Sequence, residues 1–305
     1  MKLSKRLHPG MFRLKHFKRI FPDGMDLVPS EFDMNDLLGD EHRPRLLLDA
    51  YDEKEVMRGL EYYGVLAKFE EEGFSDIKVR MDLSDPQQQK VILHLGEHKK
   101  EHVLGQIYLH SGMFYSESKY AGKLSGRHCP MLSIQWICMQ NPTKPFDNSR
   151  PALPGQQYPG LKVGRAVAKL LIYIAEERKL AGILNLPEFL HAAVLYSWRF
   201  KFLNPEAEGI LQALMRDMKQ KTLAEGSWGI QLGCIKHLDS GEALSWFKEE
   251  QVLPLRHDWV SHFEGKHYKR KVRESRDRHR FYFDEDLWRE KYPLDEEGSP
   301  KLCYS

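Results

Sequence analysis

Two glycines, Gly160 and Gly164, lie four residues apart directly before a long helical pattern of the chain. Backbone amides in the first turn of a helix have no partner within the helix, and they carry a positive partial charge. Because glycine has no side chain, an anion can approach such amides closely. The segment PGLKVGR therefore favours either a plain turn or a cradle for a diphosphate, to which Lys162 or Arg165 would add charge. Neither the G-x-x-x-x-G-K-[ST] loop nor the G-x-G-x-x-G fingerprint occurs at this turn.

The elements around this turn follow from the hydrophobic pattern. Residues 131–139 are apolar on both faces, which is typical of a central strand, and residues 141–160 contain five prolines and predict a long loop that could act as a lid. After the turn, apolar residues recur at helical spacing at Val163, Val167, Leu170, Leu171 and Ile174. A short strand begins at Gly182, and a second helix is expected over 188–200. This order predicts parallel strands on either side of the first helix.

The flanking regions complete a mixed sheet. Upstream, one helix of about twenty residues ends at Gly73. Three strand-like runs then predict an antiparallel meander: 76–83 and 102–110 alternate apolar with polar residues, and 90–96 is largely apolar. Downstream, a helix starts at Asn204 and Pro205; a strand is expected over 227–238 and a short helix over 240–250. The expected fold class is α/β, with an α+β mixed sheet.

These elements, together with AAVLYSWRFKFL at 192–203, resemble the GNAT superfamily of acyl-CoA-dependent N-acyltransferases over roughly residues 48–240. The resemblance implies a sheet that splays open between two strands, with acyl-CoA in the split and its diphosphate on a [QR]-x-x-G-x-[GA] loop. Aligning the helix start matches Gly164 to the closing glycine and leaves Lys162 at the position of the first glycine. Matching Gln157 and Gly160 instead places Lys162 at the closing position. The implied cofactor-binding residues are Gly160, Leu161, Lys162, Val163, Gly164 and Arg165.

The resemblance also implies roles for other residues. Tyr196, which follows the pattern of the family's helix together with Ala192 and Leu195, would be the general acid that protonates the CoA thiolate, or else a tyrosine packed on a helix face. The backbone at Ile137 and Met139 would hold the pantetheine arm. For the general base, Glu188 is the candidate, although an acid at a helix N-terminus can serve the helix alone. His110 and His128 are further candidates for that base.

The expected reaction is direct attack of an amine on the thioester of acyl-CoA, with acetyl-CoA as co-substrate and no metal. The acceptor can be a small molecule or a protein. The departures from the family loop at Pro159 and Lys162 leave a second interpretation open: a GNAT-like fold that has lost catalysis and serves in binding or scaffolding.

The composition of the chain indicates the class of protein, its domain organisation and its compartment. A chain of 305 residues with 41% hydrophobic and 30% charged residues is expected to fold as a globular protein with an N-terminal arm (1–47), a GNAT-like domain (48–240) and a C-terminal extension (241–305). The apolar runs fall far short of the ~20 residues of a membrane span. No signal-peptide pattern follows the basic N-terminus, so we expect a cytoplasmic protein without membrane contact. Four scattered cysteines suit a reducing compartment, and neither Cys234/His237 nor the histidines at 94, 98 and 102 have convincing metal-ligand spacing.

Two segments carry most of the excess positive charge. Residues 1–19 hold seven Lys or Arg and no acid, and residues 266–280 hold eight against two acids. Either segment could contact a nucleic-acid backbone weakly by charge neutralisation, or be an ordinary solvated surface.

Overall fold

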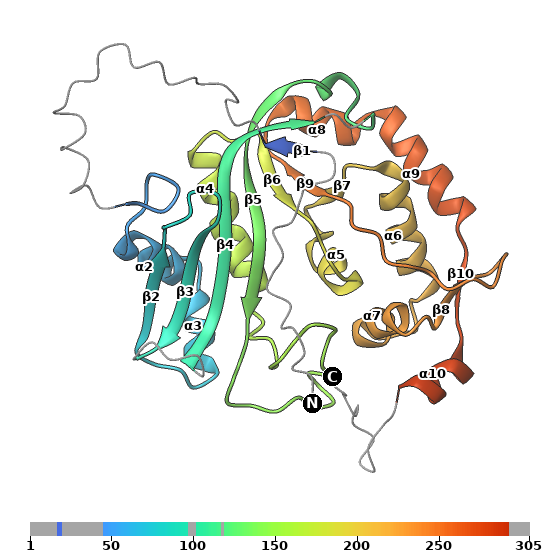
Figure 1. Cartoon of the computed structure of the whole chain (residues 1–305), viewed down its shortest axis with the longest axis horizontal. Coiled ribbons are helices and arrows are strands. Elements are labelled where there is room, and N and C mark those ends of the chain that lie inside the picture. Colours follow the sequence, from blue (N-terminus) through green and yellow to red (C-terminus); the bar gives the residue numbers. More distant parts are fainter. Residues whose placement is uncertain (1–16, 20–44, 97–101, 117–118, 293–305) are drawn as a thin grey trace, which may run out of the picture.

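The computed structural model describes residues 17–19, 45–96, 102–116 and 119–292, which form an α/β fold around one mixed sheet (Figure 1). The sheet has eight strands: seven in the order β2-β3-β4-β5-β6-β9-β7, and β1, which pairs with β4. Their bounds are β1 Phe17–Arg19, β2 Ile77–Asp82, β3 Gln89–Leu95, β4 Val103–Ser116, β5 His128–Met139, β6 Gly182–Asn185, β7 Lys201–Phe202 and β9 Gln251–Pro254. A separate two-stranded sheet joins β8 (Ile235–His237) to β10 (Phe281–Phe283).

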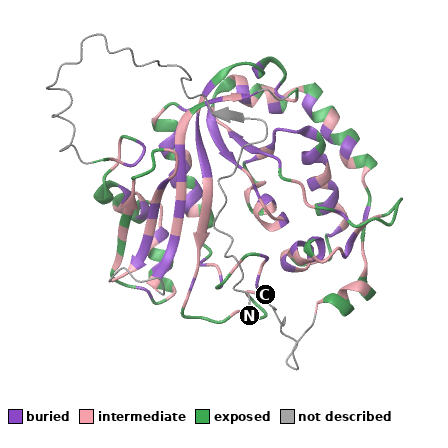
Figure 2. Ribbon diagram, viewed as in Figure 1, coloured by how far each residue is buried: buried purple, intermediate pink, exposed green. Residues whose placement is uncertain are grey.

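Helices cover both faces of the large sheet. On one face, α2 (Glu53–Tyr62), α3 (Val65–Glu71) and α4 (Gly164–Glu177) share a core with β3, β4 and β5. On the other, α8 (His257–Glu264) and α9 (Lys266–Arg278) pack around the fully buried Trp259. A third cluster joins α5 (Leu190–Tyr196), α6 (Pro205–Asp217) and α7 (Leu223–Gln231). Helix α10 (Glu285–Lys291) follows near the end of the described residues. Figure 2 shows the buried residues concentrated along the central strands.

The predicted core elements are confirmed. Strands β2, β3, β4 and β5 form the antiparallel meander, and β5 pairs in parallel with β6 across the helix α4. Strand β5 contributes residues to the clusters on both faces, as its apolar character predicts. Helix α6 starts with Pro205, and Asn204 accepts a hydrogen bond from the backbone N of Glu206 at 3.0 Å.

Three predicted elements are wrong. The single helix expected to end at Gly73 is two helices, because Gly64 takes a left-handed φ of 76° between α2 and α3. The strand expected over 227–238 is too long: residues up to Gln231 belong to the helix α7, whose capping box joins Thr222 to Glu225, and only Ile235–His237 form a strand, β8. The helix expected over 240–250 does not form; an extended segment leads into β9 instead.

Strand β9 lies between β6 and β7, so residues after 241 supply part of the central sheet. Leu47 and Leu48, each 2% exposed, are likewise in the main core. Among the described residues, no helix combines the length and apolarity that crossing a membrane requires.

Candidate functional site

Strands β5 and β6 run together for only four residues. Residues 131–134 of β5 pair with residues 182–185 of β6, where β6 ends, while β5 continues to Met139 alongside β4 alone (Figure 1). The register of β4 with β5 shifts at the same place, because Tyr108 faces Trp136 and Leu109 faces Ile134, which leaves Gln135 as an extra residue. A bulge of this kind bends a strand and increases its local twist. The bulge at Gln135 directly follows the last β5 residue that pairs with β6, so it lies where the two strands part.

The end of β5 directs backbone groups of alternate residues towards the split. The carbonyl of Met139 accepts a hydrogen bond from the N–H of Leu161 at 3.2 Å, so it points away from β4. In a strand, the N–H and C=O of a residue point to the same edge, and residues two apart share that edge. Met139 and Ile137 thus both direct their amides towards the side that β6 has left. These are the two residues whose backbone, by the family resemblance, would hold the pantetheine arm.

The glycine turn is fastened to this edge. Gly160 forms a bridge with Gln140, and the N–H of Asn141 donates to the carbonyl of Pro159 at 2.7 Å. Leu161 is buried, whereas Lys162 is exposed and takes a left-handed φ of 57°. Lys162 thus has the backbone conformation that glycine adopts most easily, at the position where one register of the family loop expects glycine.

Helix α4 begins here without a cap. Val163 stands at the N-cap position, its side chain is buried and makes no capping bond, and the first turn contains no acid. The amides of Gly164, Arg165 and Ala166 have no acceptor among the described residues. Gly164 is exposed, and a Cβ added to it would meet no atom within 4 Å. Side chains cap α2, α6, α7 and α10, whereas α3, α5, α8 and α9 also begin without a side-chain cap, so the distinctive feature of α4 is the exposed glycine at its first position. The α4 N-terminus can therefore accept an anion from solvent.

Two buried carboxamides lie at the apex of the split, and neither is among the residues predicted from the sequence. Asn185 is the last residue of β6 and is 4% exposed; within the described part of the chain, neither its Oδ1 nor its Nδ2 has a hydrogen-bond partner. It faces Gln251 of β9, so the two side chains share a face of the sheet. Gln251 donates from Nε2 to the carbonyl of Ala193 at 3.2 Å, while its Oε1 has no described partner. The only sequence signal was a polar residue inside the apolar run GILNLP.

Tyr196 lies at the C-terminal end of α5 and is half-buried. Its ring packs edge-on against Phe200 at 5.2 Å and, like Ile137 and Met139, against the main core. Burial raises the pKa of Tyr196 to about 12, so the hydroxyl is protonated at neutral pH and can donate a proton or a hydrogen bond. The structure gives this hydroxyl no hydrogen bond to any described residue.

The candidate bases lie at three separate places in the fold. Glu188 precedes the N-cap of α5 and forms an ion pair with Lys248 at 3.4 Å. His128 is exposed at the start of β5, at the opposite end of the strand from Met139. His110 is buried on β4, with Nδ1 3.2 Å from the carbonyl of Pro86.

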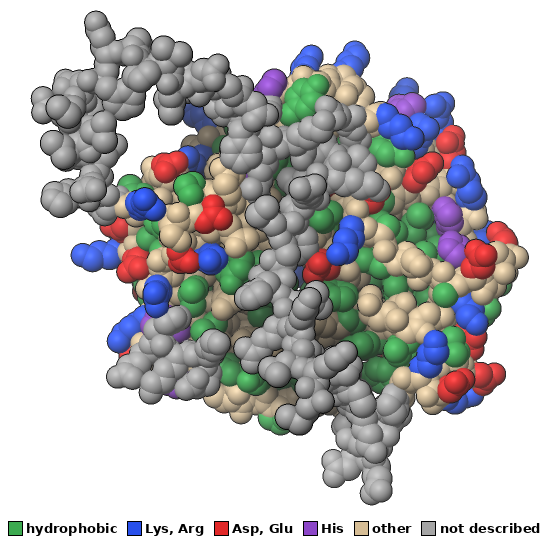
Figure 3. Space-filling view, in the orientation of Figure 1, with side chains coloured by type: hydrophobic (Ala, Val, Ile, Leu, Met, Phe, Trp, Pro, Cys, Tyr) green, Lys and Arg blue, Asp and Glu red, His purple; other side chains and the backbone are tan. Residues whose placement is uncertain are grey.

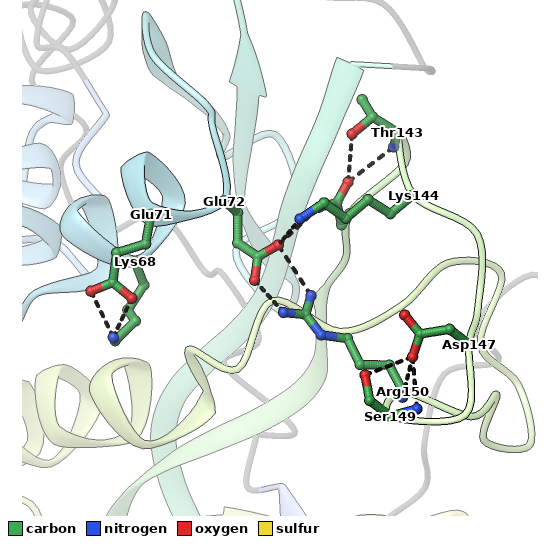
Figure 4. Close-up of polar contacts among 9 residues, drawn as sticks. Lys68, Glu71, Glu72, Thr143, Lys144, Asp147, Ser149 and Arg150 are labelled. Atoms are coloured by element: carbon green, nitrogen blue, oxygen red, sulfur yellow. Dashed lines mark hydrogen bonds and ion pairs between the residues drawn. The ribbon is translucent and has the colours of Figure 1, made fainter.

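The proline-rich loop 141–160 is held on one side of the split by Glu72, the residue after α3. The Glu72 carboxylate accepts hydrogen bonds from Lys144 at 2.8 Å, from Asn141 at 3.3 Å and from both terminal nitrogens of Arg150 (Figure 4). Hydrogen bonds from Arg150 and Lys144 lower the pKa of Glu72 to about 2. Asp147 adds a turn within the loop by accepting from the backbone N and the hydroxyl of Ser149 at 2.7 and 2.6 Å.

The same loop is held on the other side by α5 and α7. Trp228 donates from Nε1 to the carbonyl of Ala152 at 2.9 Å. Gly155, at a left-handed φ of 81°, sits so close to Phe189 that a Cβ would lie 3.0 Å from its ring. The loop therefore bridges the elements on both sides of the split and forms a fixed rim in this structure.

Comparison of the chain with protein-family models, with curated proteins and with solved structures gives no match. Across the described residues, no group of three His, Cys, Asp or Glu side chains is placed to hold a metal ion.

Proposed function

We propose that this protein is an acyl-CoA-dependent N-acyltransferase with a GNAT-like fold. The observation that carries the proposal is the parting of β5 from β6 directly beside the uncapped N-terminus of α4. The diphosphate of acyl-CoA would accept hydrogen bonds from the amides of residues 163–166. The pantetheine arm would then follow the edge of β5 at Ile137 and Met139, which no other described strand covers, on from the glycine turn that bonds to the Met139 carbonyl.

Acyl-CoA bound along β5 would also give the buried carboxamides of Asn185 and Gln251 a hydrogen-bond partner. An arm running along β5 from Met139 towards Ile134 would bring the thioester near the apex, where Asn185 and Gln251 lie. A buried carboxamide without partners is costly, and a bound ligand that hydrogen-bonds to it removes the cost. We assign Asn185 to orienting the acceptor amine, because its carboxamide can both accept from and donate to a polar group.

In the proposed reaction, the amine nitrogen attacks the thioester carbonyl and forms a C–N bond. The C–S bond then breaks, and the CoA thiolate takes a proton from the Tyr196 hydroxyl. Tyr196 recovers a proton from the ammonium of the product-forming intermediate through water. Proximity in the split and backbone donors on β5 would supply most of the rate. Glu188 is paired with Lys248, so we keep it only as a proposed base that takes this same ammonium proton through water and passes it on to Tyr196.

The departure at Lys162 is compatible with a diphosphate site. Its left-handed φ of 57° shows that the backbone at this position has the shape a glycine would allow. Its side chain is exposed and adds a positive charge beside the proposed diphosphate.

Calorimetric titration with acetyl-CoA and with acetyl-pantetheine tests the proposal. We expect saturable binding of acetyl-CoA and much weaker binding of acetyl-pantetheine, which lacks the diphosphate. Absence of acetyl-CoA binding by the folded protein would refute both the enzyme and a cofactor-binding scaffold. Binding without acyl transfer to any amine of a broad panel would favour the scaffold.

A second candidate function is binding of a nucleic acid through α9. Tyr268, Val272 and Ser275 face inward, and most of the remaining positions of α9 are exposed and basic, with the acids Glu274 and Asp277 among them (Figure 3). Its exposed cations include Lys266, Lys269, Arg270, Arg273 and Arg278, and Arg280 follows just after the helix. Retention of the protein on immobilised RNA or DNA should weaken steeply with salt and fall further when Lys269, Arg270 and Arg273 are replaced by Gln. The proposed contact through residues 1–19 falls almost entirely outside the described residues.

A further inference from the structure

A separate pocket of about 590 Å³ lies between α2 and α4, above strands β3 and β4. Its inner wall is apolar and is formed by residues from the helices and the sheet floor: Leu47, Val56, Leu60, Val91, Ile107, Leu109, Leu170 and Ile174. The two helices approach closely at Gly59, where a Cβ would lie 2.9 Å from the Leu170 side chain. A volume in this range suits a small organic ligand with an apolar body.

Tyrosines surround the pocket. Tyr62 and Tyr63 meet edge-on at 5.1 Å between ring centroids, and Tyr63 lies 6.0 Å from Tyr173 of α4. Tyr51 also lines the pocket, and its hydroxyl donates to Glu177. Tyr62 is 83% exposed and Tyr173 is 47% exposed, so an unusual amount of aromatic surface is left in water at one place.

The charges around the pocket favour a positive ligand. Glu55 and Glu177 line it, whereas Arg58 is the one cation among its lining residues. The Arg58 side chain is 72% exposed and lies 4.0 Å from Glu55. Glu176 and Arg178, which neighbour Glu177, add one charge of each sign nearby. The faces of the tyrosine rings are also electron-rich.

From these features we infer that the α2–α4 pocket binds an organic cation that carries an alkyl or aryl body. The apolar body lies against the floor of Val91, Ile107 and Leu109. The cationic head lies among Tyr62, Tyr63 and Tyr173, where ring faces and Glu177 stabilise the positive charge. This site lies beside the helix that begins at the proposed diphosphate site, but it uses different residues and does not depend on the proposed acyl transfer.

Titration of the full-length protein with octyltrimethylammonium and with nonanoate tests the inference, because the two probes differ in the sign of the head group and share an alkyl chain. We expect saturable binding of the cation and at least about tenfold weaker binding of nonanoate. Replacement of Tyr62 and Tyr173 together by Leu keeps apolar volume and should weaken the cation about fivefold or more. Tyr282→Leu, at a partly exposed tyrosine on β10, is the matched control and should leave the affinity unchanged.

Two results would overturn the inference. One is equal or tighter binding of nonanoate, which would assign the pocket to an anion held by Arg58. The other is failure of the cation to bind a protein that melts cooperatively. If the Tyr62→Leu, Tyr173→Leu double variant has a lowered melting temperature, Glu177→Gln provides the same test at an exposed side chain. An unchanged affinity for the cation in both Glu177→Gln and the single variant Tyr62→Leu would also overturn the inference.

Discussion

Gly164 offers a substitution that separates ligand binding from folding. It is the first residue of α4, it is exposed, and a Cβ there meets no atom within 4 Å. Replacing glycine inside a helix with Glu or Gln gains up to about 0.5–1 kcal/mol of helix propensity. A carboxylate in the first turn adds about 0.3–1 kcal/mol through the helix dipole. Gly164→Glu should therefore be at least as stable as the parent protein.

The same carboxylate should oppose acyl-CoA binding. Two negative charges 4 Å apart repel by about 1 kcal/mol in bulk water and by about 4 kcal/mol at an effective dielectric constant of 20. Since 1.4 kcal/mol corresponds to about tenfold in affinity, Gly164→Glu is expected to weaken acetyl-CoA at least about tenfold relative to Gly164→Gln. The Gln variant has nearly the same shape, so comparison of the two isolates the charge.

Calorimetric titration at low and at moderate salt, with a thermal melt of each variant, measures both effects. The difference between Glu and Gln should shrink as salt rises, because exposed charges are screened. Equal affinities in two folded variants would show that no diphosphate lies at the α4 N-terminus, and the proposed cofactor site would then be wrong.

Three further results are expected. Tyr196→Phe should lower the turnover number by roughly tenfold or more while the acetyl-CoA affinity changes little, and an unchanged pH-rate profile and rate in this variant would exclude Tyr196 as the acid. Glu72→Gln should lower the free energy of unfolding by about 2 kcal/mol and speed proteolysis within 141–160, because Lys144 and Arg150 lose a charged partner. Since the pKa of Glu72 is lowered to about 2, its stabilisation is complete above its ordinary pKa of 4.5 and is lost as pH falls towards 2. The unfolding free energies of parent and variant should therefore converge in acid. Burial lowers the pKa of His191 from 6.5 to about 4, so between these pH values the unfolded chain binds a proton that the folded chain does not. The free energy of unfolding should therefore fall by up to about 3 kcal/mol as pH drops from 6.5 to 4. In urea unfolding measured across this pH range, His191→Gln should show a smaller fall.

Local patterns predicted those elements whose burial repeats at a fixed period. The apolar stripe from Val163 to Ile174 fixes which face of α4 packs on the sheet, and the alternation at 76–83 fixes β2. The T-x-x-E spacing at Thr222 and Glu225 was also present, and it would have identified α7 in place of a strand. In each case, the information lies within a few residues of the element.

The tertiary structure alone decided where the sheet opens. The bulge at Gln135 depends on how β5 registers against β4, and the early end of β5–β6 pairing depends on the length of β6. Asn185 and Gln251 are more than sixty residues apart, and they meet only because β9 inserts between β6 and β7. Hydrophobic periodicity records whether a residue is buried, but it does not record which distant strand pairs with it. The sequence could therefore propose an anion site at Gly164, whereas the buried carboxamides beside the split became visible only in the folded chain.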